Sequence, residues 1–424
     1  MNKTIAIIGI TAIGIIIVAK HLLSSEEKVV IPELQKPNWR AQMHITNENY
    51  VPYIDQYSII RDTDTLGGAF RKYYSKYIDY IAPNGKPIRI LAQDKVTDSQ
   101  VLYAYSLLEF YLKNLGKDVA NKMADNDAIL VMPNGADRDG NTSEKALIGQ
   151  PQFQDETANV GSQWYMENDY THRDSTYEEV FHLVHGFGIG MVTDQRMPGG
   201  APELAHKIYV AQQNAVPTDR KLWGKEGLWL LGMDEDSLTE WENEPGTLES
   251  EYIISVIDAY YGNWEAFDGG GALFGEYIAK TRDEVAEKDP MGYELITSFL
   301  PEYINTFIPV DTNFTGTFNM NYDSNQPYTF KSQYLQHLIL QGQNAVNIIG
   351  NEQDNIFMGN AGINKIDGGK GKNVVQLRGM SSEYSTTTND GVVTVRDTVA
   401  NRDGELILTN IQTLRFIDKD ITQH

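Results

Sequence analysis

The sequence of 424 residues contains no cysteine. A chain without cysteine forms no disulfide framework, offers no thiolate to a metal ion and carries no cysteine nucleophile. Cysteine-based zinc sites and thiol hydrolases are therefore excluded. The absence is compatible with every cellular compartment, so it does not indicate where the protein works.

Basic residues are scarce relative to acidic ones. Lys and Arg together number 35 while Asp and Glu number 58, which gives a formal net charge of −23 at pH 7. A nucleic acid or an anionic lipid surface would be repelled by such a chain, so no nucleic-acid partner is expected. The sequence also lacks a G-x-S-x-G nucleophile motif and a P-loop. An acidic surface is typical of secreted, cation-binding or salt-adapted proteins, and the charge alone does not separate these classes.

Long apolar runs are missing except at the N-terminus, where residues 4–19 carry no charge and are followed by Lys20 and His21. A basic residue before an apolar core is typical of a secretory signal peptide, and the length approaches that of a membrane-spanning helix. No clear cleavage site follows. Residues 1–23 are therefore predicted to be a signal peptide or a retained signal anchor. Both interpretations predict an extracytoplasmic protein, either secreted or attached to the membrane through this segment.

The rest of the chain divides by composition. Residues 24–40 are polar, contain two prolines and are predicted to be a linker. Residues 41–310 show the mixed periodicity of one α+β domain. Helices are predicted at 98–116, 175–188, 249–264 and 291–304, the last of them interrupted by Pro301. A buried strand is predicted at 128–135 and an exposed edge strand at 160–166.

The stretch STYEEVFHLVHGFG, residues 175–188, resembles the zinc-helix signature H-E-x-x-H, but glutamate replaces its first histidine. Glu178 and His182 lie four residues apart and therefore on one face of a helix, where they can chelate one ion. Glu179 lies about 100° round the helix, where the general base of the signature stands. His185 offers an alternative pair with His182, but it is about 10 Å along the axis from Glu178, too far to share its ion.

Hydrolysis at a metal centre needs a third ligand and an open position for water. The best donor is Glu251, in the helical stretch ESEYIISVIDAYYG. Two carboxylates and one imidazole around a divalent ion give a neutral set, whereas two histidines and one carboxylate leave a charge of +1. A less positive centre lowers the pKa of bound water less. Harder ligands also shift the preference from Zn²⁺ towards Mn²⁺ or Fe²⁺, so a slow protease or another divalent transition metal is expected.

The order of these elements resembles the zincin fold in its gluzincin arrangement, and more narrowly the anthrax lethal-factor-like domains, over residues 95–305. The resemblance implies a metal-dependent peptidase acting on a peptide or protein. It assigns Glu178 as first ligand, Glu179 as general base, His182 as second ligand and Glu251 as third. In the mechanism predicted here, His185 assists these residues or serves as a substitute ligand. The tyrosine that this family places about seven residues before the third ligand is absent, because Glu244 stands there.

The same helix admits a metal-free interpretation. Ser175 or Thr176 could cap the helix, with Glu178 or Glu179 completing a capping box and complementing the helix dipole. The histidines would then be hydrogen-bonded core residues. This alternative predicts a non-enzymatic surface or adhesion scaffold derived from a zincin fold.

Beyond residue 311 the helical periodicity gives way to a repeat of nine residues. Residues 311–336 are predicted to be a connector, and 337–424 a parallel β-roll, because a nine-residue period of glycines is typical of that fold. In each unit glycine opens the repeat, asparagine stands sixth and an apolar residue stands eighth. The three units contain Gly350, Asn355 and Phe357; Gly359, Asn364 and Ile366; and Gly368, Asn373 and Val375.

This stretch resembles the RTX, or hemolysin-type calcium-binding, repeats, which implies Ca²⁺ between the turns of the roll. The sixth position of the family is aspartate, and Ca²⁺ prefers carboxylate oxygens. Asparagine at all three sixth positions therefore predicts weak calcium binding, with Asp354 and Asp367 as the nearby carboxylates. Two alternatives stay open: a purely structural roll of stacked asparagines, and a secreted factor whose roll folds only when it meets calcium outside the cell. The predicted fold class is an α+β zincin-like domain followed by an all-β C-terminal parallel β-roll.

Overall fold

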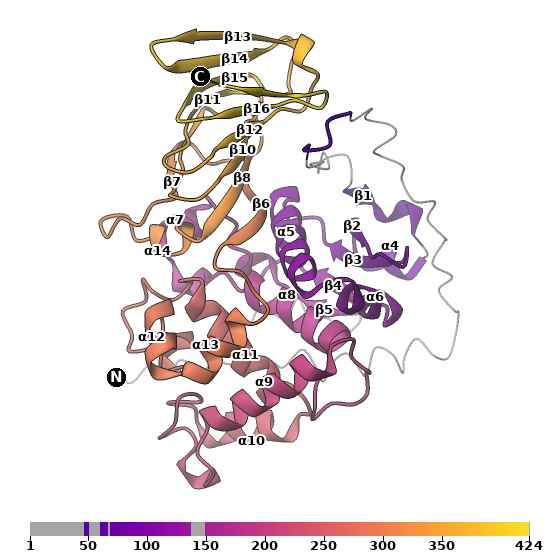
Figure 1. Ribbon diagram of the computed structural model, residues 1–424. Helices are drawn as coiled ribbons and strands as arrows, with labels where there is room; N and C mark the ends of the chain where they lie inside the picture. The colour runs from indigo at the N-terminus through magenta and orange to yellow at the C-terminus, as the bar shows by residue number, and fades with distance from the viewer. Residues whose placement is uncertain (1–45, 51–59, 67, 137–148, 424) are drawn as a thin grey trace.

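A computed structural model describes residues 46–50, 60–66, 68–136 and 149–423 (Figure 1). The predicted signal segment, 1–23, and the predicted linker, 24–40, lie outside the described residues. Within the described ranges, no helix combines the length and the apolar character that crossing a bilayer requires.

The N-terminal part contains a five-stranded mixed sheet in the order β1-β2-β3-β4-β5. The first three strands are antiparallel, and β4 and β5 run parallel to their neighbours. The strand predicted at 128–135 is β4, which is buried over most of its length. The bounds are β1 Arg61–Asp62, β2 Lys76–Ile81, β3 Pro87–Ala92, β4 Ile129–Met132 and β5 Gln150–Pro151.

Helix α5, Asp98–Leu115, is the long helix predicted from the sequence. Thr97 and Gln100 form a capping box at its start, and Gly116 ends it with φ of 86°, a conformation that glycine adopts without strain. Apolar side chains are buried almost all round this helix, because other elements cover it on more than one side. The short helices α4, Gly68–Tyr73, and α6, Lys117–Asp125, lie beside the same sheet (Figure 1).

A helical layer lies on the other side of α5 (Figure 1). It contains the predicted metal helix, α8, which continues into one π-helical turn, and the predicted glutamate-bearing helix, α11. Their bounds, with those of the neighbouring helices, are α8 Thr176–Val184, the π-turn His185–Ile189, α9 Pro202–Ala215, α10 Glu235–Asn243, α11 Thr247–Tyr260, α12 Arg282–Lys288 and α13 Pro290–Thr297.

Two sequence predictions in this region are wrong. The exposed strand predicted at 160–166 is a turn followed by helix α7, Gln163–Glu167, because the Ser162 hydroxyl accepts from the Tyr165 amide and starts a helix there. The helix predicted at 291–304 ends at Thr297. Pro301 has no amide hydrogen to continue the helix, and the chain then enters strand β6.

The C-terminal part consists of two parallel sheets whose strands alternate along the chain. Strands β6, β8, β10, β12 and β16 run parallel in one sheet, and β7, β9, β11 and β15 in the other. The sheets begin earlier than residue 337. Their bounds are β6 Ile304–Val310, β7 Gly316–Asn319, β8 Leu335–Leu340, β9 Val346–Ile349, β10 Ile356–Met358, β11 Ile363–Asp367, β12 Val374–Gln376, β15 Glu405–Thr409 and β16 Thr413–Arg415.

The predicted eighth-position side chains form the centre of this roll. Phe357 pairs with Val375 on the neighbouring strand of one sheet, while Ile366 lies in the other sheet. All three are at most 1% exposed. Successive nine-residue units therefore send their apolar side chains to one core from opposite walls.

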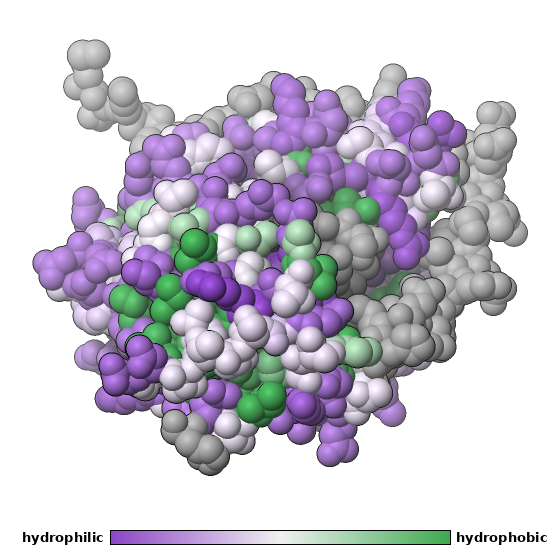
Figure 2. All heavy atoms as spheres, turned by 90° about the horizontal axis from the view of Figure 1, so that it is seen from above, coloured by the Kyte–Doolittle hydropathy of each residue, from purple (hydrophilic) through white to green (hydrophobic). Residues whose placement is uncertain are grey.

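Antiparallel strands finish both sheets at their C-terminal edges: the hairpin β13, Tyr384–Asn389, and β14, Val392–Asp397, and the strand β17, Asp420–Thr422. The outermost strand β13 is rich in threonine and largely exposed, and a polar edge resists pairing with other chains. Seen from above, hydrophilic and near-neutral residues cover most of the visible face, with apolar ones in small separate groups (Figure 2).

The roll packs directly against α5. Thr306 donates to the Ser106 carbonyl, Lys113 donates to the Asn305 carbonyl at 2.6 Å, and the buried Ser99 hydroxyl donates to Gln341. One cluster of buried apolar side chains runs from the sheet through the helical layer into the roll. Helix α5, which also packs against α8, is thus held between the sheet and the roll.

Candidate metal centre

The start of α8 is fixed by Asp174. Its carboxylate accepts from the Thr176 amide and hydroxyl, and its second oxygen accepts from the Tyr103 hydroxyl of α5 at 2.5 Å. The side chain of Ser175 makes no capping hydrogen bond. Asp174 therefore supplies the capping oxygen that the metal-free interpretation assigned to Ser175 or Thr176, and Glu178 and Glu179 complete no capping box with them.

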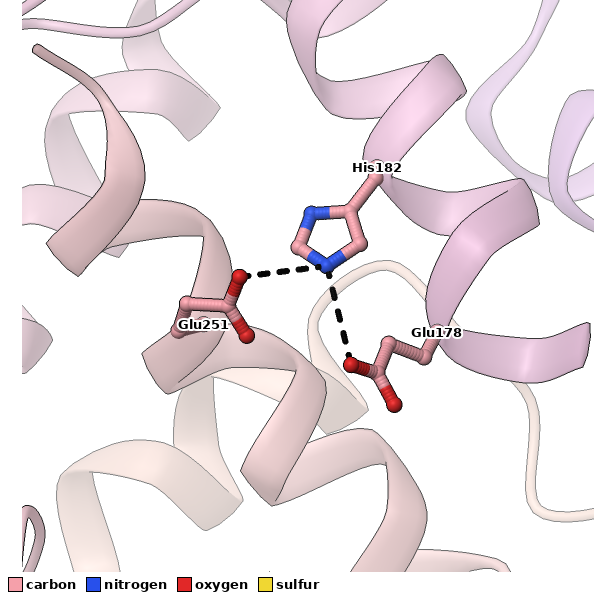
Figure 3. Close-up of side chains that lie close together, drawn as sticks. All are labelled: Glu178, His182 and Glu251. Carbon is pink, nitrogen blue, oxygen red and sulfur yellow. Dashed lines mark ion pairs between the residues drawn. The ribbon is translucent and has the colours of Figure 1, made fainter. Parts of the chain in front are cut away.

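The structure brings Glu178, His182 and Glu251 together (Figure 3). One ligand atom from each lies within 4.8 Å of the others. His182 Nε2 is 4.0 Å from Glu178 Oε1 and 3.5 Å from Glu251 Oε1, and the three side chains are only 5–14% exposed. Donor atoms of a tetrahedral ion with bonds of about 2.1 Å are about 3.4 Å apart. The His182–Glu251 separation is close to that value and the Glu178 oxygen lies farther from His182, so the three side chains, supplied by α8 and α11, form a candidate site for a divalent ion.

His182 is oriented by Ser250. The two residues approach at 2.7 Å between Nδ1 and the hydroxyl oxygen, and both are buried. When Nδ1 donates to this hydroxyl, the lone pair of Nε2 faces the two carboxylates, as a metal ligand requires. Burial, only partly offset by the Glu178 charge, lowers the pKa of His182 to about 4, so the neutral imidazole is the form present at physiological pH.

His185, predicted as an additional or substitute ligand, stands outside this group. It opens the π-helical turn, is fully buried, and its Nδ1 lies 3.3 Å from the same Ser250 hydroxyl. Its contact with the centre therefore runs through Ser250 and His182.

Glu179 points to a different neighbour. Its Oε2 accepts from the Gln150 side chain at 2.7 Å, which ties α8 to strand β5. Burial, followed by the negative charge of Glu178, raises the pKa of Glu179 well above its usual range. A carboxyl group with a raised pKa is a stronger base than an exposed one, which suits a proton acceptor.

Arg173 was not predicted from the sequence. Its Nη1 donates to Glu178 Oε2 at 2.6 Å. Burial alone would raise the pKa of Glu178, but this guanidinium, by charge and hydrogen bond, brings the pKa below its usual value. The pKa of Glu251 shifts in the opposite direction. Burial and then the charges of Glu178 and Glu276 raise it well above the usual range.

The other glutamate of the E-S-E stretch has a structural role. Glu249 is buried and accepts from the Val192 and Thr193 amides and from the Thr193 hydroxyl. It thereby holds the loop that follows the π-turn against α11, which leaves Glu251 as the ligand donor of that helix.

The RTX resemblance implies Ca²⁺ between the turns of the roll, where the side chains of Asn355 and Asn373 form hydrogen bonds. The buried Asn373 side chain accepts from the Asn355 amide and donates to the Lys370 and Asn410 carbonyls. Asn355 donates in the same way to the Gln336 carbonyl and to the Asn351 side chain. Amide hydrogens therefore point at carbonyl oxygens between the turns.

The nearby carboxylates are also engaged. Asp354 accepts from the Lys372 amide, and Asp367 accepts from the Gly369 amide and the Asn410 side chain. In the described residues, the α8–α11 centre is the only place where three or more acidic or histidine side chains bring their ligand atoms close enough together to hold one metal ion. These hydrogen bonds favour the alternative of a roll held by asparagines, while weak calcium binding around Gly350, Gly359, Asn364 and Gly368 stays a prediction, and the Asn355 side-chain oxygen is buried there without a hydrogen-bond partner.

Comparisons with known proteins add little. No family model matches the sequence, and no curated protein matches it. Among solved structures, the extracellular lipase LipA from Serratia marcescens is similar at 9% identity with a TM-score of 0.20, over 88% of this chain and 58% of the lipase chain. The chain thus spans less than two thirds of the lipase, and a TM-score of 0.20 does not establish a shared fold.

Proposed function

We propose that the protein is an exported, metal-dependent peptidase with a zincin-like domain, and that Glu178, His182 and Glu251 hold its metal ion. The observation that carries this proposal is the convergence of three ligand atoms from two helices within 4.8 Å. The family resemblance in the sequence supports the same three residues. A divalent ion held there would act as a Lewis acid and lower the pKa of water.

Other residues around the centre have supporting roles in the proposed mechanism. Glu179 would serve as the general base for such a water, because it follows Glu178 on α8 and its pKa is raised by burial and by the Glu178 charge. Ser250 keeps Nε2 of His182 free of hydrogen.

The test begins with the purified full chain. Elemental analysis is expected to find about one transition-metal ion per chain, and unstructured peptides are expected to be cleaved. Glu179→Gln should keep the metal and lose at least about 100-fold of the cleavage rate, since general-base catalysis contributes about 10²–10⁴-fold. Glu203→Gln, on the exposed start of α9, is the matched control and should change neither. A wild-type chain without a transition metal would rule out the proposal.

The second candidate is a non-enzymatic surface or adhesion scaffold. Its specific support is that Glu178 already has a cationic partner in Arg173, so this carboxylate does not depend on an ion for charge balance. This candidate predicts that Glu178→Ala and His182→Ala leave binding to the protein's natural surface or partner unchanged. Loss of metal without any change in that binding would favour the scaffold.

A further inference from the structure

Glu178 divides its two carboxylate oxygens between different neighbours. Oε2 accepts from the Arg173 guanidinium at 2.6 Å, while Oε1 faces His182 Nε2 at 4.0 Å. One oxygen is therefore left for an ion, and the other is held by a cation. The side chains of Arg173 and Glu178 are 24% and 11% exposed, so water screens their charges only weakly.

The partnership alters the charge of the centre. In H-E-x-x-H the first ligand is a neutral imidazole. Here Glu178 contributes one negative charge and Arg173 one positive charge, so the two together are also neutral. Counting a divalent ion with Glu178 and Glu251 alone gives zero, as predicted from the sequence, whereas including Arg173 gives +1. That is the charge of the usual set of two histidines and one carboxylate.

We propose that Arg173 and Glu178 act as one neutral ligand unit that replaces the missing histidine and keeps the centre's net charge suited to hydrolysis. The inference rests on the proposed function, because it presupposes a metal at this site. Arg173 is a positioning residue that acts through Glu178 and touches no ion. Its charge also reaches the other ligands: it opposes the rise in the pKa of Glu251 and adds to the fall in the pKa of His182.

The first experiment replaces the Arg173–Glu178 unit by the histidine of the usual signature. Co²⁺ is titrated spectroscopically into the metal-free full chain and three variants: Arg173→Gln, Glu178→His, and the two combined. Glu178→His alone leaves the Arg173 charge unbalanced beside the ion, so Co²⁺ should bind at least about 30-fold more weakly than to wild type, by the Coulomb cost of one nearby charge. Adding Arg173→Gln should restore affinity to within about threefold, because the centre again carries +1.

The second readout is the pH midpoint of the Co²⁺ absorption change. Arg173→Gln removes one positive charge from the centre and should raise the midpoint by about 2 units, which is the Coulomb effect of one unit charge at an assumed separation of about 6 Å and an effective dielectric constant of about 20. Arg173→Lys keeps the charge and should keep the midpoint within about 0.5 unit of wild type. This pair of variants leaves Glu178 in place, so it decides the question even where Glu178→His does not fold, as checked by circular dichroism.

The outcomes separate two failures. Wild-type protein that binds no metal would overturn the proposed function and this inference with it. Wild-type protein that binds Co²⁺, combined with an Arg173→Gln change that fails to rescue Glu178→His, would overturn the inference alone. The same holds when Arg173→Lys and Arg173→Gln share one pH midpoint, since Arg173 would then only anchor the Glu178 side chain.

Discussion

The Ser250 hydroxyl lies between two buried imidazoles, 2.7 Å from His182 Nδ1 and 3.3 Å from His185 Nδ1. A hydroxyl donates only one hydrogen. When His182 donates to it, the hydroxyl hydrogen is free to point at His185. This arrangement leaves His182 Nε2 as an acceptor and fixes the orientation of its ring.

Ser250→Ala is therefore expected to weaken metal binding by about 10–100-fold, the usual effect of removing the partner of a ligating histidine. The measurement is competition titration of the full chain with a chromophoric chelator. Ser255→Ala removes a hydroxyl from the same helix, which there donates only to the Glu251 carbonyl, and serves as the control. Equal affinities for the two variants would show that Ser250 does not orient His182.

At the residue scale, the sequence predicted those site residues whose relative positions are fixed by the geometry of a single helix. Glu178 and His182 share a face by spacing alone, and the structure places both at the centre. Glu251 was inferred from the order of elements and joins them. Arg173 and Ser250 could not be found in this way, because an arginine in a loop and a serine in a helix acquire their partners only through side-chain direction and tertiary packing.

At the scale of secondary-structure elements, the roll has the nine-residue winding of the repeat, but asparagines stand where the RTX family has aspartates. Asn355 and Asn373, one full turn apart, are fully buried and linked by a hydrogen bond from the Asn355 amide to the Asn373 side chain. The period predicted the strands because glycine positions and apolar eighth positions fix the winding. The period could not predict which carbonyls of the neighbouring turns each amide would reach, since those carbonyls lie 16 to 37 residues away along the chain.

Calcium is accordingly expected to have little effect on the folded roll. Adding millimolar Ca²⁺ to the metal-free full chain should move the midpoint of thermal unfolding by less than about 1 °C, because a ligand stabilises only in proportion to its binding. Asn373→Asp is the contrasting variant. It places a carboxylate against the Lys370 and Asn410 carbonyls, so it should be less stable than wild type without Ca²⁺ and respond more to it. A wild-type midpoint that rises by several degrees with Ca²⁺ would contradict the prediction.

The misassigned stretch 160–166 marks the limit of periodicity for short elements. Seven residues that alternate in polarity fit a strand, but Gly161 with φ of 83° and Asn168 with φ of 50° bound a single helical segment there. Ser162 starts that helix. Local capping and turn geometry decided its structure over the alternation.

Helix α7 is joined to the roll by a buried lysine. Lys331, in the short helix α14, Thr329–Ser332, donates to the Tyr165 carbonyl at 2.9 Å and also contacts the Asn168 side chain. Burial, which outweighs the opposing charge of Asp174, lowers the pKa of Lys331 to about 7. The unfolded chain keeps a lysine pKa near 10.5.

The sign of the resulting pH dependence follows from these two values. Below about pH 7 the lysine is charged in both the folded and the unfolded state, so burying the charge lowers the free energy of unfolding by its full amount. Between about pH 7 and 10.5 the unfolded chain binds more protons than the folded one, so the free energy of unfolding rises with pH. Relative to Lys331→Met, the wild-type free energy of unfolding should rise by up to about 1.4 kcal/mol per pH unit in that interval. Urea unfolding at pH 7 and 9.5 measures it. Lys365→Met, at an exposed position of β11, should show no such trend, and a flat difference for Lys331→Met would refute the assignment.

On the scale of the whole molecule, the sequence predicted two regions in the right order. Their boundary differs, because β6 and β7 already belong to the sheets of the roll. The buried cluster crosses this boundary without a break. Contacts between segments far apart in sequence create that continuity, and no local pattern could reveal it.

The shared core predicts that the described parts unfold together. Differential scanning calorimetry of the full chain should give one transition, with agreement between the calorimetric and van't Hoff enthalpies. Two resolved transitions would mean that the contacts between α5 and β6 do not couple the regions.

Salt should raise the transition temperature, since screening reduces the self-repulsion of a chain with a net charge of −23.

The alternation of strands between the two walls also restricts how this fold can change in length. Inserting or deleting a single nine-residue unit would send every later strand to the wall opposite its present one, and the closing strands β15 and β16 would exchange places. Two units added together restore the original sides. Lengthening by evolution or by design should therefore be tolerated in even numbers of units, and a variant with one extra unit should fail to fold where a variant with two succeeds.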